Sequence, residues 1–566
     1  MKNRASSHLL ALLLIAGFEV VGYMAVYRSG LLRGYEPSVI IAARDLLMYV
    51  PLILLLFWLS RRMKFAGDWT LYTTAILLFS IGMLVQYRLY SDPEYNSRNK
   101  AAARAEKTQV LRLRYINDYY DAEKKKMLGL ATDAPQSSQP SAAPGQADVR
   151  RSSITVASAI RSPYTWIYLF AFFALAASYW LCARDDFLAW LQRHSFSIVL
   201  ITLIPLAAAV STSSAGKALG NMTPWEPSKI PFLIGFAGIL TALYKELART
   251  YWGIPRARDL VPLIVMAVIP FIPFFALKDF GQMLVFSGAY ATLYLVAVRR
   301  WPQLLLFVGS IALVISVLVV GALPETVQAQ IPFLPTLARP VKAALPDRIQ
   351  QRFHLWLDGF NPPAPDVDWW RKDYNEALAE SPKMKELAEQ SPAMQRTVNV
   401  DIWFDRLAFQ PSQATFGIAA GGTTGRGLGL GFAEVIPVAD SDYIYAAVGE
   451  ELGVVGGAIV LLALVVFVVA GTRIALNARD MFTKLCAAGL TAFIGLQALV
   501  NIGGVTRALP MTGITLPFVS HGGFSLITSF AMLGMLMAFS HHIARDAQAA
   551  RPARAARPQF GPEVVE

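Results

Sequence analysis

Four carboxylates stand at the beginning of a strongly apolar run in the last third of the chain. The stretch VADSDYIYAAVGEELG contains Asp440, Asp442, Glu450 and Glu451, and the run VVGGAIVLLALVVFVVAG follows it directly. Carboxylates are costly within a membrane, and those found there are paired or functional. Glu450 and Glu451 lie roughly 12–14 Å beyond Asp442 along a helix. We therefore expect them to anchor the loop as buried hydrogen-bond or ion-pair partners, with Arg507 as one partner, rather than to share the role of Asp442.

Further charged residues fall on the side of the membrane where we place the carboxylate loop. They are Glu226, Lys229, Lys278, Asp279, Arg348, Arg352 and Arg507. Cations and carboxylates gathered at helix ends on one face indicate a site for an anionic substrate with a polar head. The structural alternative is that each charge caps a helix or snorkels to the interface, which explains most such residues taken singly.

The composition indicates an integral membrane protein. The chain has 566 residues, of which 55% are hydrophobic and 16% charged, with a mean hydropathy of +0.43, far too apolar for a soluble globular protein. Apolar runs of roughly 17 to 25 residues predict an all-α polytopic membrane protein with about twelve transmembrane helices. The runs lie near 9–27, 39–60, 71–89, 164–182, 195–211, 230–246, 261–277, 281–298, 302–322, 453–472, 483–503 and 517–540. Cys182 and Cys486 have neither zinc-site spacing nor a disulfide framework.

The distribution of positive charge predicts the topology. With the N-terminus inside, the cytoplasmic segments hold about twenty Lys and Arg and the short loops on the other face about six, the asymmetry of the positive-inside rule. We therefore expect a multi-pass protein of the cytoplasmic membrane with both termini in the cytoplasm. This topology and anionic headgroups explain the net charge of +12, so no nucleic-acid partner is expected.

Two long polar segments, 90–163 and 323–440, form extracytoplasmic loops in this topology. The first ends in a linker rich in Pro, Ser, Ala and Gln, which we expect to be disordered. The second carries four tryptophans among charged residues, which favours docking on the membrane surface or on a partner. They are Trp356, Trp369, Trp370 and Trp403.

The stretch GGTTGRGLGLG, residues 421–431, has the glycine content of a phosphate-binding loop, but it lacks the lysine of such a loop and follows no predicted strand. We expect a turn that lets the backbone approach a substrate or a neighbouring helix, with plain loop geometry as the alternative.

Two C-terminal blocks resemble the SEDS family of bacterial peptidoglycan glycosyltransferases, which includes RodA, FtsW and SpoVE. The blocks are GRGLGLGFAEVIPVADSDYIYAAVGEELGVVGG and GGVTRALPMTGITLPFVSHGGFSL. The stretches TPWEPSKI, LKDFG, RFHLWLDGF and FQPSQATFGIAAGG are similar to further family motifs, so the resemblance covers residues 68–540. Residues 1–67 are then an extra N-terminal transmembrane hairpin, as in RodA-like members, and residues 541–566 are a basic cytoplasmic tail.

The resemblance implies polymerisation of lipid II, with inversion at the donor sugar, during cell-wall elongation or division. A sugar hydroxyl is a poor nucleophile and a diphosphate an anionic leaving group, so the reaction needs a base and positive charge. Asp442 matches the catalytic aspartate, although the usual motif P-E-x-H-T-D reads PVADSD here and adds Asp440. The residues expected to contact substrate are Arg507, Lys229, Lys278, Glu226, Arg352, Ser520 and His521. A divalent cation, Mg²⁺ or Mn²⁺, on Asp442 or Asp279 is compatible with this chemistry but not required by it.

The resemblance also implies a partner, a single-pass class B penicillin-binding protein that crosslinks the strands. The aromatic residues in Phe360–Phe409, a segment longer than in the family, favour docking of that partner through Trp369 and Trp370. The alternative function is a lipid-precursor flippase or transporter, which also lines a cavity with charges. Against it stand the lack of a visible inverted repeat and the clustering of charges on one face. A structural scaffold would leave the carboxylate loop unexplained.

Overall fold

The computed structural model describes residues 2–92, 154–212, 225–251, 254–268, 280–298 and 347–555, together with Tyr95 and Gly309. Within these residues the chain is helical except for loops and one antiparallel pair of strands, β1 (Thr250–Tyr251) and β2 (Ile254–Pro255). The first helices are α1 (Lys2–Leu32), α2 (Val39–Leu47), α3 (Tyr49–Phe57), the π-helical η1 (Trp58–Arg62), α4 (Thr70–Ser91), α7 (Val156–Arg161), α8 (Pro163–Cys182), α9 (Asp185–Arg193), α10 (Ser195–Thr212), α11 (Trp225–Ala248), α12 (Ala257–Val268) and α14 (Phe280–Val298). The later ones are α18 (Asp347–Asp358), α19 (Asp368–Glu380), α20 (Pro382–Gln390), α21 (Pro392–Arg406), α22 (Phe409–Gly421), the 3₁₀ turn η2 (Ala433–Val435), α23 (Ile444–Asn477), α24 (Met481–Val505) and α25 (Gly523–Ala555). The predicted all-α fold is confirmed.

Nine helices in the described part of the chain are long and apolar enough to cross a membrane. They are Ser6–Leu32, Val39–Arg62, Thr70–Ser91, Pro163–Cys182, Glu226–Ala248, Gly281–Val298, Ile444–Asn477, Met481–Val505 and Gly523–Ala549. Each coincides with a predicted segment. Of the other three segments, 195–211 falls in α10, 261–277 is described only in part, and 302–322 lies outside the described residues apart from Gly309. The total of twelve therefore stays a prediction.

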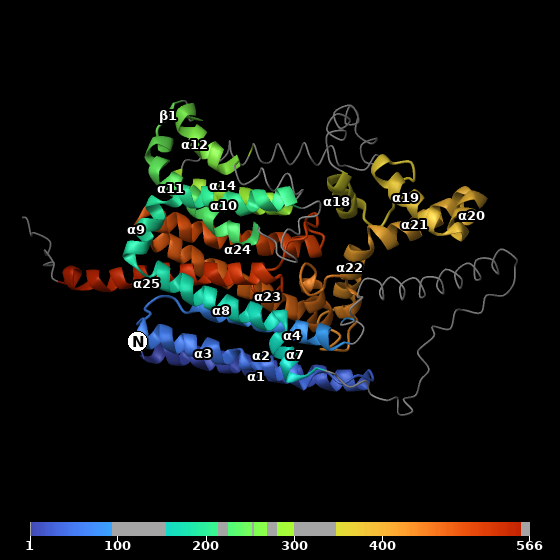
Figure 1. Ribbon diagram of the computed structural model, residues 1–566, viewed down its shortest axis with the longest axis horizontal. Helices are drawn as coiled ribbons and strands as arrows, with labels where there is room; N and C mark the ends of the chain where they lie inside the picture. Colours follow the sequence, from blue (N-terminus) through green and yellow to red (C-terminus); the bar gives the residue numbers. More distant parts are fainter. Residues whose placement is uncertain are drawn as a thin grey trace, which may run out of the picture.

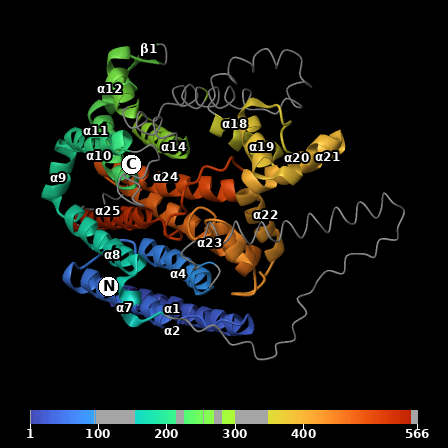
Figure 2. The same ribbon diagram turned by 45° about the vertical axis from the view of Figure 1, so that its right-hand side comes forward.

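The long helices run side by side along the long axis of the molecule, as Figure 1 shows for α1, α8, α23 and α25. Helix α8 packs on α25, and α4 lies between α1 and α23. The start of α1 and the far end of α25 lie at one end of this bundle, whereas α19–α21 lie at the other (Figures 1 and 2). Both described chain ends thus share one side, as the topology requires; which side is cytoplasmic stays a prediction, as does the exposure of the linker in 90–163, which is outside the described residues.

Residues 506–522, which join α24 to α25, contain no helix or strand and fold back into the bundle. Leu516, Phe518 and Val519 are buried there. A Cβ on Gly82 of α4 would lie 2.3 Å from the carbonyl oxygen of Val519, so only glycine lets this loop pass so close to the helix. The part of the 506–522 loop around Val519 is thereby fixed against α4.

Helices α18–α21 form a separate helical lobe with its own hydrophobic core. Trp369 is 9% exposed, and Trp370 and Trp403 are fully buried in this core. The indole of Trp370 donates to Asn399 Oδ1 at 2.8 Å, and that of Trp403 donates to the carbonyl oxygen of Gly359 at 3.0 Å. The interpretation of these three tryptophans as anchors for a membrane or a partner is wrong, because they bury their surface against the chain itself.

Candidate functional site

Asp442 lines a cavity of about 220 Å³ at the end of the bundle that carries the helical lobe. Arg352 and Arg507 line the same cavity, so the structure brings together one predicted base and two predicted cations. Asp442 lies just before α23, Arg352 belongs to α18, and Arg507 belongs to the 506–522 loop. The remaining wall consists of Leu355, Trp356, Leu407, Gln410, Pro411, Tyr443, Gly504, Leu509, Met511 and Gly513.

The two arginines tie the helical lobe to the 506–522 loop. Arg352 Nη1 donates to the carbonyl oxygen of Thr512 at 3.2 Å. Arg507 Nη2 donates to the carbonyl oxygens of Leu355 and Trp356 at 3.1 and 3.3 Å, and the indole of Trp356 donates back to the carbonyl of Arg507 at 3.1 Å. These contacts of Arg507 with described residues all use Nη2, while a guanidinium has five N–H donors. Nη1 and Nε of Arg507 make no hydrogen bond to the described residues, and their N–H donors suit an anion in the cavity.

The conformation of Arg507 is itself constrained. Its φ of 61° lies in the left-handed region, which is costly for a residue other than glycine. Its guanidinium stacks 4.5 Å from the ring centroid of Phe360, which adds a cation–π contact. The hydrogen bonds of its side chain, the stacking on Phe360 and the backbone conformation together fix the orientation of the Arg507 guanidinium.

Hydrogen bonds to the backbone hold the turn that carries Asp442. Asn501 Nδ2 of α24 donates to the carbonyl of Asp442 at 2.9 Å, and Ser520 Oγ donates to the carbonyl of Ser441 at 2.6 Å. The positive φ of Gly513, 74°, lets its backbone approach the cavity, and a Cβ there would lie 3.6 Å from Asp442 Oδ2 and 3.9 Å from Arg352 Nη2. The carboxylate and this guanidinium thus converge on one point. Burial and the Asp442 carboxylate raise the pKa of neighbouring Tyr443, which stays a neutral phenol.

Asp440, the other aspartate of the motif, has different surroundings. Its Oδ2 accepts from the hydroxyl of Tyr90 at 2.6 Å, and Tyr90 also contacts the hydroxyl of Tyr164. Its carbonyl accepts from the backbone N–H of His521 at 3.1 Å. Asp440 is not part of the wall of the Asp442 cavity. The geometry therefore favours Asp442 as the residue that meets substrate.

Ser520 and His521, both predicted to bind substrate, lie behind the turn rather than in the cavity wall. Ser520 Oγ also accepts from the backbone N–H of Leu516 at 2.8 Å. The ring of His521 is hydrogen-bonded to the hydroxyl of Tyr168, and burial lowers its pKa well below the ordinary value, so it is neutral. In this structure both residues support the backbone of the turn; direct contact with substrate stays a prediction.

Glu226 and Lys229 form a second polar cluster, buried between α11 and α24. Lys229 Nζ lies 2.7 Å from Glu226 Oε2 and 3.0 Å from Gln497 Oε1. Gln497 in turn donates to the carbonyl of Thr515 at 3.0 Å. The pair is linked to the 506–522 loop, but neither member lines the Asp442 cavity. Lys278 and Asp279 lie outside the described residues, so their predicted roles stay predictions.

The partner of Glu451 is Arg88, a residue that the sequence did not single out. Arg88 Nε lies 3.0 Å from Glu451 Oε1, and both side chains are fully buried. Glu450 accepts from the backbone N–H of Phe432 at 2.6 Å. The prediction that both glutamates are buried anchors is confirmed, but the expectation of Arg507 as a partner is wrong, because Arg507 bonds to α18. An arginine inside the apolar run of α4 was the available signal, since such a charge needs a partner.

The glycine-rich stretch 421–431 lies against the first turns of α23, as predicted for a close approach to a helix. The N–H groups of Arg426 and Gly427 donate to the carbonyls of Glu450 and Glu451 at 2.9 and 3.0 Å. At Gly425, with φ of 85°, a Cβ would lie 2.2 Å from the carbonyl of Glu451. Only glycine permits this approach.

The described residues do not form a complete divalent-cation site at Asp442. Among them no group of three or more His, Cys, Asp and Glu side chains is placed to hold a metal ion. The Asp442 cavity joins a single carboxylate to two guanidinium groups, an arrangement that favours an anion over Mg²⁺ or Mn²⁺. A divalent cation on Asp442 or Asp279 stays a prediction, and Asp279 lies outside the described residues.

Comparison with known proteins identifies the relatives of this chain. Residues 397–545 match the FtsW/RodA/SpoVE family model, described as cell cycle protein. The peptidoglycan glycosyltransferase RodA of Mycobacterium tuberculosis is 28% identical over 351 residues, 61% of each chain. Stage V sporulation protein E of Bacillus subtilis is 40% identical over 144 residues, 25% of this chain and 39% of that protein. The crystal structure of Thermus thermophilus RodA matches with a TM-score of 0.40 and 15% identity, over 85% of this chain and 97% of that one. The chain spans about three fifths of the length of the mycobacterial relatives it matches.

Proposed function

Because this chain belongs to the FtsW/RodA/SpoVE family, we propose that it is a peptidoglycan glycosyltransferase. It polymerises lipid II into glycan strands at the outer face of the bacterial cytoplasmic membrane. The observation that carries the proposal is the cavity that Asp442 shares with Arg352 and Arg507. A carboxylate opposite two fixed guanidinium groups suits a reaction in which a hydroxyl loses a proton while an anionic group departs.

In the proposed reaction the Asp442 carboxylate takes the proton from the C4 hydroxyl of an acceptor GlcNAc. The oxygen attacks C1 of the donor MurNAc from the face opposite the leaving group. The new C4–O–C1 bond forms as the bond from C1 to the diphosphate oxygen breaks, which inverts the configuration at C1. The electron pair leaves with undecaprenyl diphosphate, and Arg352 and Arg507 neutralise the developing negative charge.

The site lies at the end of the bundle, which suits a lipid-linked substrate. Asp442 stands two residues before the first residue of α23, one of the helices able to span a membrane. A substrate with its prenyl chain in the bilayer can then present its diphosphate and sugars at the helix ends. A flippase would place its polar site near the middle of the membrane instead.

A class B penicillin-binding protein is the proposed partner, because a glycan strand must be crosslinked after it is polymerised. The support comes from family membership. With Trp369 and Trp370 buried in the lobe core, any contact with that partner has to use other residues.

The test is polymerisation of labelled lipid II by the purified protein in detergent. Asp442→Asn should lower the rate about 10²- to 10⁴-fold, the usual contribution of a general base, with the melting temperature unchanged. Asp440→Asn is the matched control and should lower it less than tenfold, because an Asn oxygen can still accept from Tyr90. Full activity of Asp442→Asn would exclude this mechanism. An inactive wild type that moves lipid II across vesicles would favour the flippase.

A further inference from the structure

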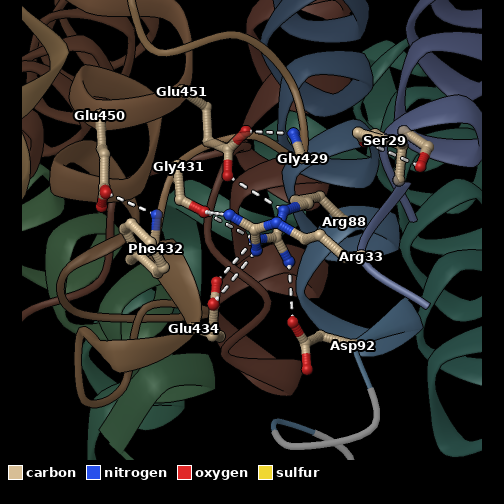
Figure 3. A network of polar contacts seen from close by, with 11 residues as sticks. Ser29, Arg33, Arg88, Asp92, Gly429, Gly431, Phe432, Glu434, Glu450 and Glu451 are labelled. Atoms are coloured by element: carbon tan, nitrogen blue, oxygen red, sulfur yellow. Dashed lines mark hydrogen bonds and ion pairs between the residues drawn. The ribbon is translucent and has the colours of Figure 1, made fainter. Parts of the chain in front are cut away.

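One buried network of charges joins the segments that precede and follow the turn with Asp442, and Figure 3 shows this network. Glu434 stands eight residues before Asp442, and Glu450 stands eight residues after it. Arg88 Nη2 lies 2.6 Å from Glu434 Oε2, and Arg88 Nε lies 3.0 Å from Glu451 Oε1. One fully buried guanidinium therefore joins the segment that enters the turn to the helix that leaves it.

Arg33, the residue that directly follows the N-terminal helix α1, is a second arginine in this network. Arg33 Nη1 lies 3.2 Å from Glu434 Oε1, and Arg33 Nη2 donates to the carbonyl oxygen of Gly431. The guanidinium also lies over the ring of Phe432, 5.1 Å from its centroid. The Arg33 and Glu434 side chains are only 21% and 9% exposed, so water screens the pair weakly. Glu434 thus receives one arginine on each carboxylate oxygen.

Helix α1 also presses directly on the same stretch of backbone. A Cβ on Gly429 would lie 1.9 Å from Ser29 Oγ, and Ser29 is buried. The N–H of Gly429 donates to the carboxylate of Glu451, and the N–H of Phe432 donates to Glu450 at 2.6 Å. The backbone from Gly429 to Glu434 is therefore clamped between α1 and α23.

We propose that Arg33 is a positioning residue, which acts through Glu434 to hold Asp442 in the orientation needed for proton removal. The inference rests on the proposed function for its catalytic part only. Arg33 lies outside residues 397–545, the part of the chain matched by the family model. The N-terminal hairpin, residues 1–67, then supports the site rather than serving only to anchor the chain in the membrane.

Arg33→Met tests this role, with Arg28→Met as the matched control. Arg28 is an exposed arginine in the last turns of α1, five residues before Arg33. Two quantities are measured, hydrogen exchange of the peptide covering 429–442 and the steady-state kinetics of lipid II polymerisation. We expect Arg33→Met to speed exchange in that peptide about tenfold and to lower kcat about 10- to 100-fold, since small misplacements of a reacting group cost about that much. KM should change less than twofold, because Arg352 and Arg507 are untouched. Arg28→Met should change neither quantity.

Each outcome bears on the proposal. Unchanged exchange in Arg33→Met overturns it, and so does faster exchange with wild-type kcat, which would reduce Arg33 to a structural contact. If Arg33→Met does not fold, Arg33→Lys keeps the charge but loses the fork that reaches both Glu434 and Gly431, and the same two measurements apply. A wild type that cannot polymerise lipid II refutes the proposed function, while the exchange measurement still decides whether Arg33 clamps the turn.

Discussion

Replacing Trp370 with alanine tests whether the helical lobe is stabilised by its own hydrophobic core. The indole is fully buried and donates to Asn399 Oδ1. Truncating a buried tryptophan costs about 3–5 kcal/mol, and leaving the buried amide oxygen without a donor costs about 1–3 kcal/mol more. The lobe should lose about 4–8 kcal/mol of its free energy of unfolding. This is a large share of the stability of a small domain, so the lobe should unfold locally while the membrane helices stay folded.

Limited proteolysis of the purified protein measures this loss. Cleavage within Phe360–Phe409 follows the population of the open lobe, and each 1.4 kcal/mol is a tenfold change. Trp370→Ala should therefore be cleaved at least about 10³-fold faster than the wild type. Trp370→Phe keeps most of the ring and should be intermediate, and Glu386→Ala, on the exposed face of α20, should behave as wild type. If Trp370→Ala resists the protease but loses a binding partner, the lobe core is not the reason for this tryptophan.

Three further outcomes check the turn, the lobe and the topology. Gly425→Ala should lower the melting temperature more than Gly34→Ala. The two glycines have a similar positive φ, 85° and 82°, but a Cβ at Gly425 would lie 2.2 Å from a backbone atom, whereas a Cβ at Gly34 would meet nothing within 4 Å. Equal melting temperatures would contradict the close approach of Gly425 to α23. Burial lowers the pKa of His354 from its ordinary value of 6.5, so the unfolded lobe binds the proton more readily than the folded lobe does. The stability of the lobe should therefore be full well above pH 6.5 and fall as the pH drops below it. Protease resistance measures this, and His354→Gln should remove the dependence. A cysteine at position 137, outside the described residues, should react with a membrane-impermeant thiol reagent in spheroplasts, and a cysteine at position 549 should not. Cys182 and Cys486 should not react, because they are buried. The reverse labelling pattern would invert the topology.

The membrane helices and the main members of the site could be predicted from the sequence. A span needs roughly twenty apolar residues in a row, and that requirement is local, so the runs found in the sequence recur as helices. Asp442, Arg352 and Arg507 were also predictable as a group, because the predicted topology puts all three on one face of the membrane and each falls in a stretch that resembles a family motif. The structure adds that they share a cavity.

Long-range pairings could not be predicted in the same way. An arginine in an apolar helix demands a partner, but the sequence does not say that Arg88 pairs with Glu451, 363 positions away. Likewise, tryptophans among charged residues predict that their side chains are buried, but not against which surface. Trp370 could have been buried against a membrane, a partner or this chain with the same sequence signal, and only the packing of α19 on α21 decides for the chain itself.

The two halves of the proposed site are supported by different parts of the fold. Asp442 depends on the network of Glu434, Arg88 and Glu451 within the bundle. The positive charge depends on α18, since Arg352 belongs to that helix and Arg507 bonds to its carbonyls. Substitutions at Arg33, just after α1, should therefore disturb the base, and substitutions in the helical lobe should disturb the cations that face it. Because the turn needs contacts between segments some 400 residues apart in sequence, such as Arg33 with Glu434, its geometry forms only when the whole bundle is assembled. An isolated C-terminal half, although it contains Asp442 and Arg507, would lack both supports of the base that come from α1 and α4.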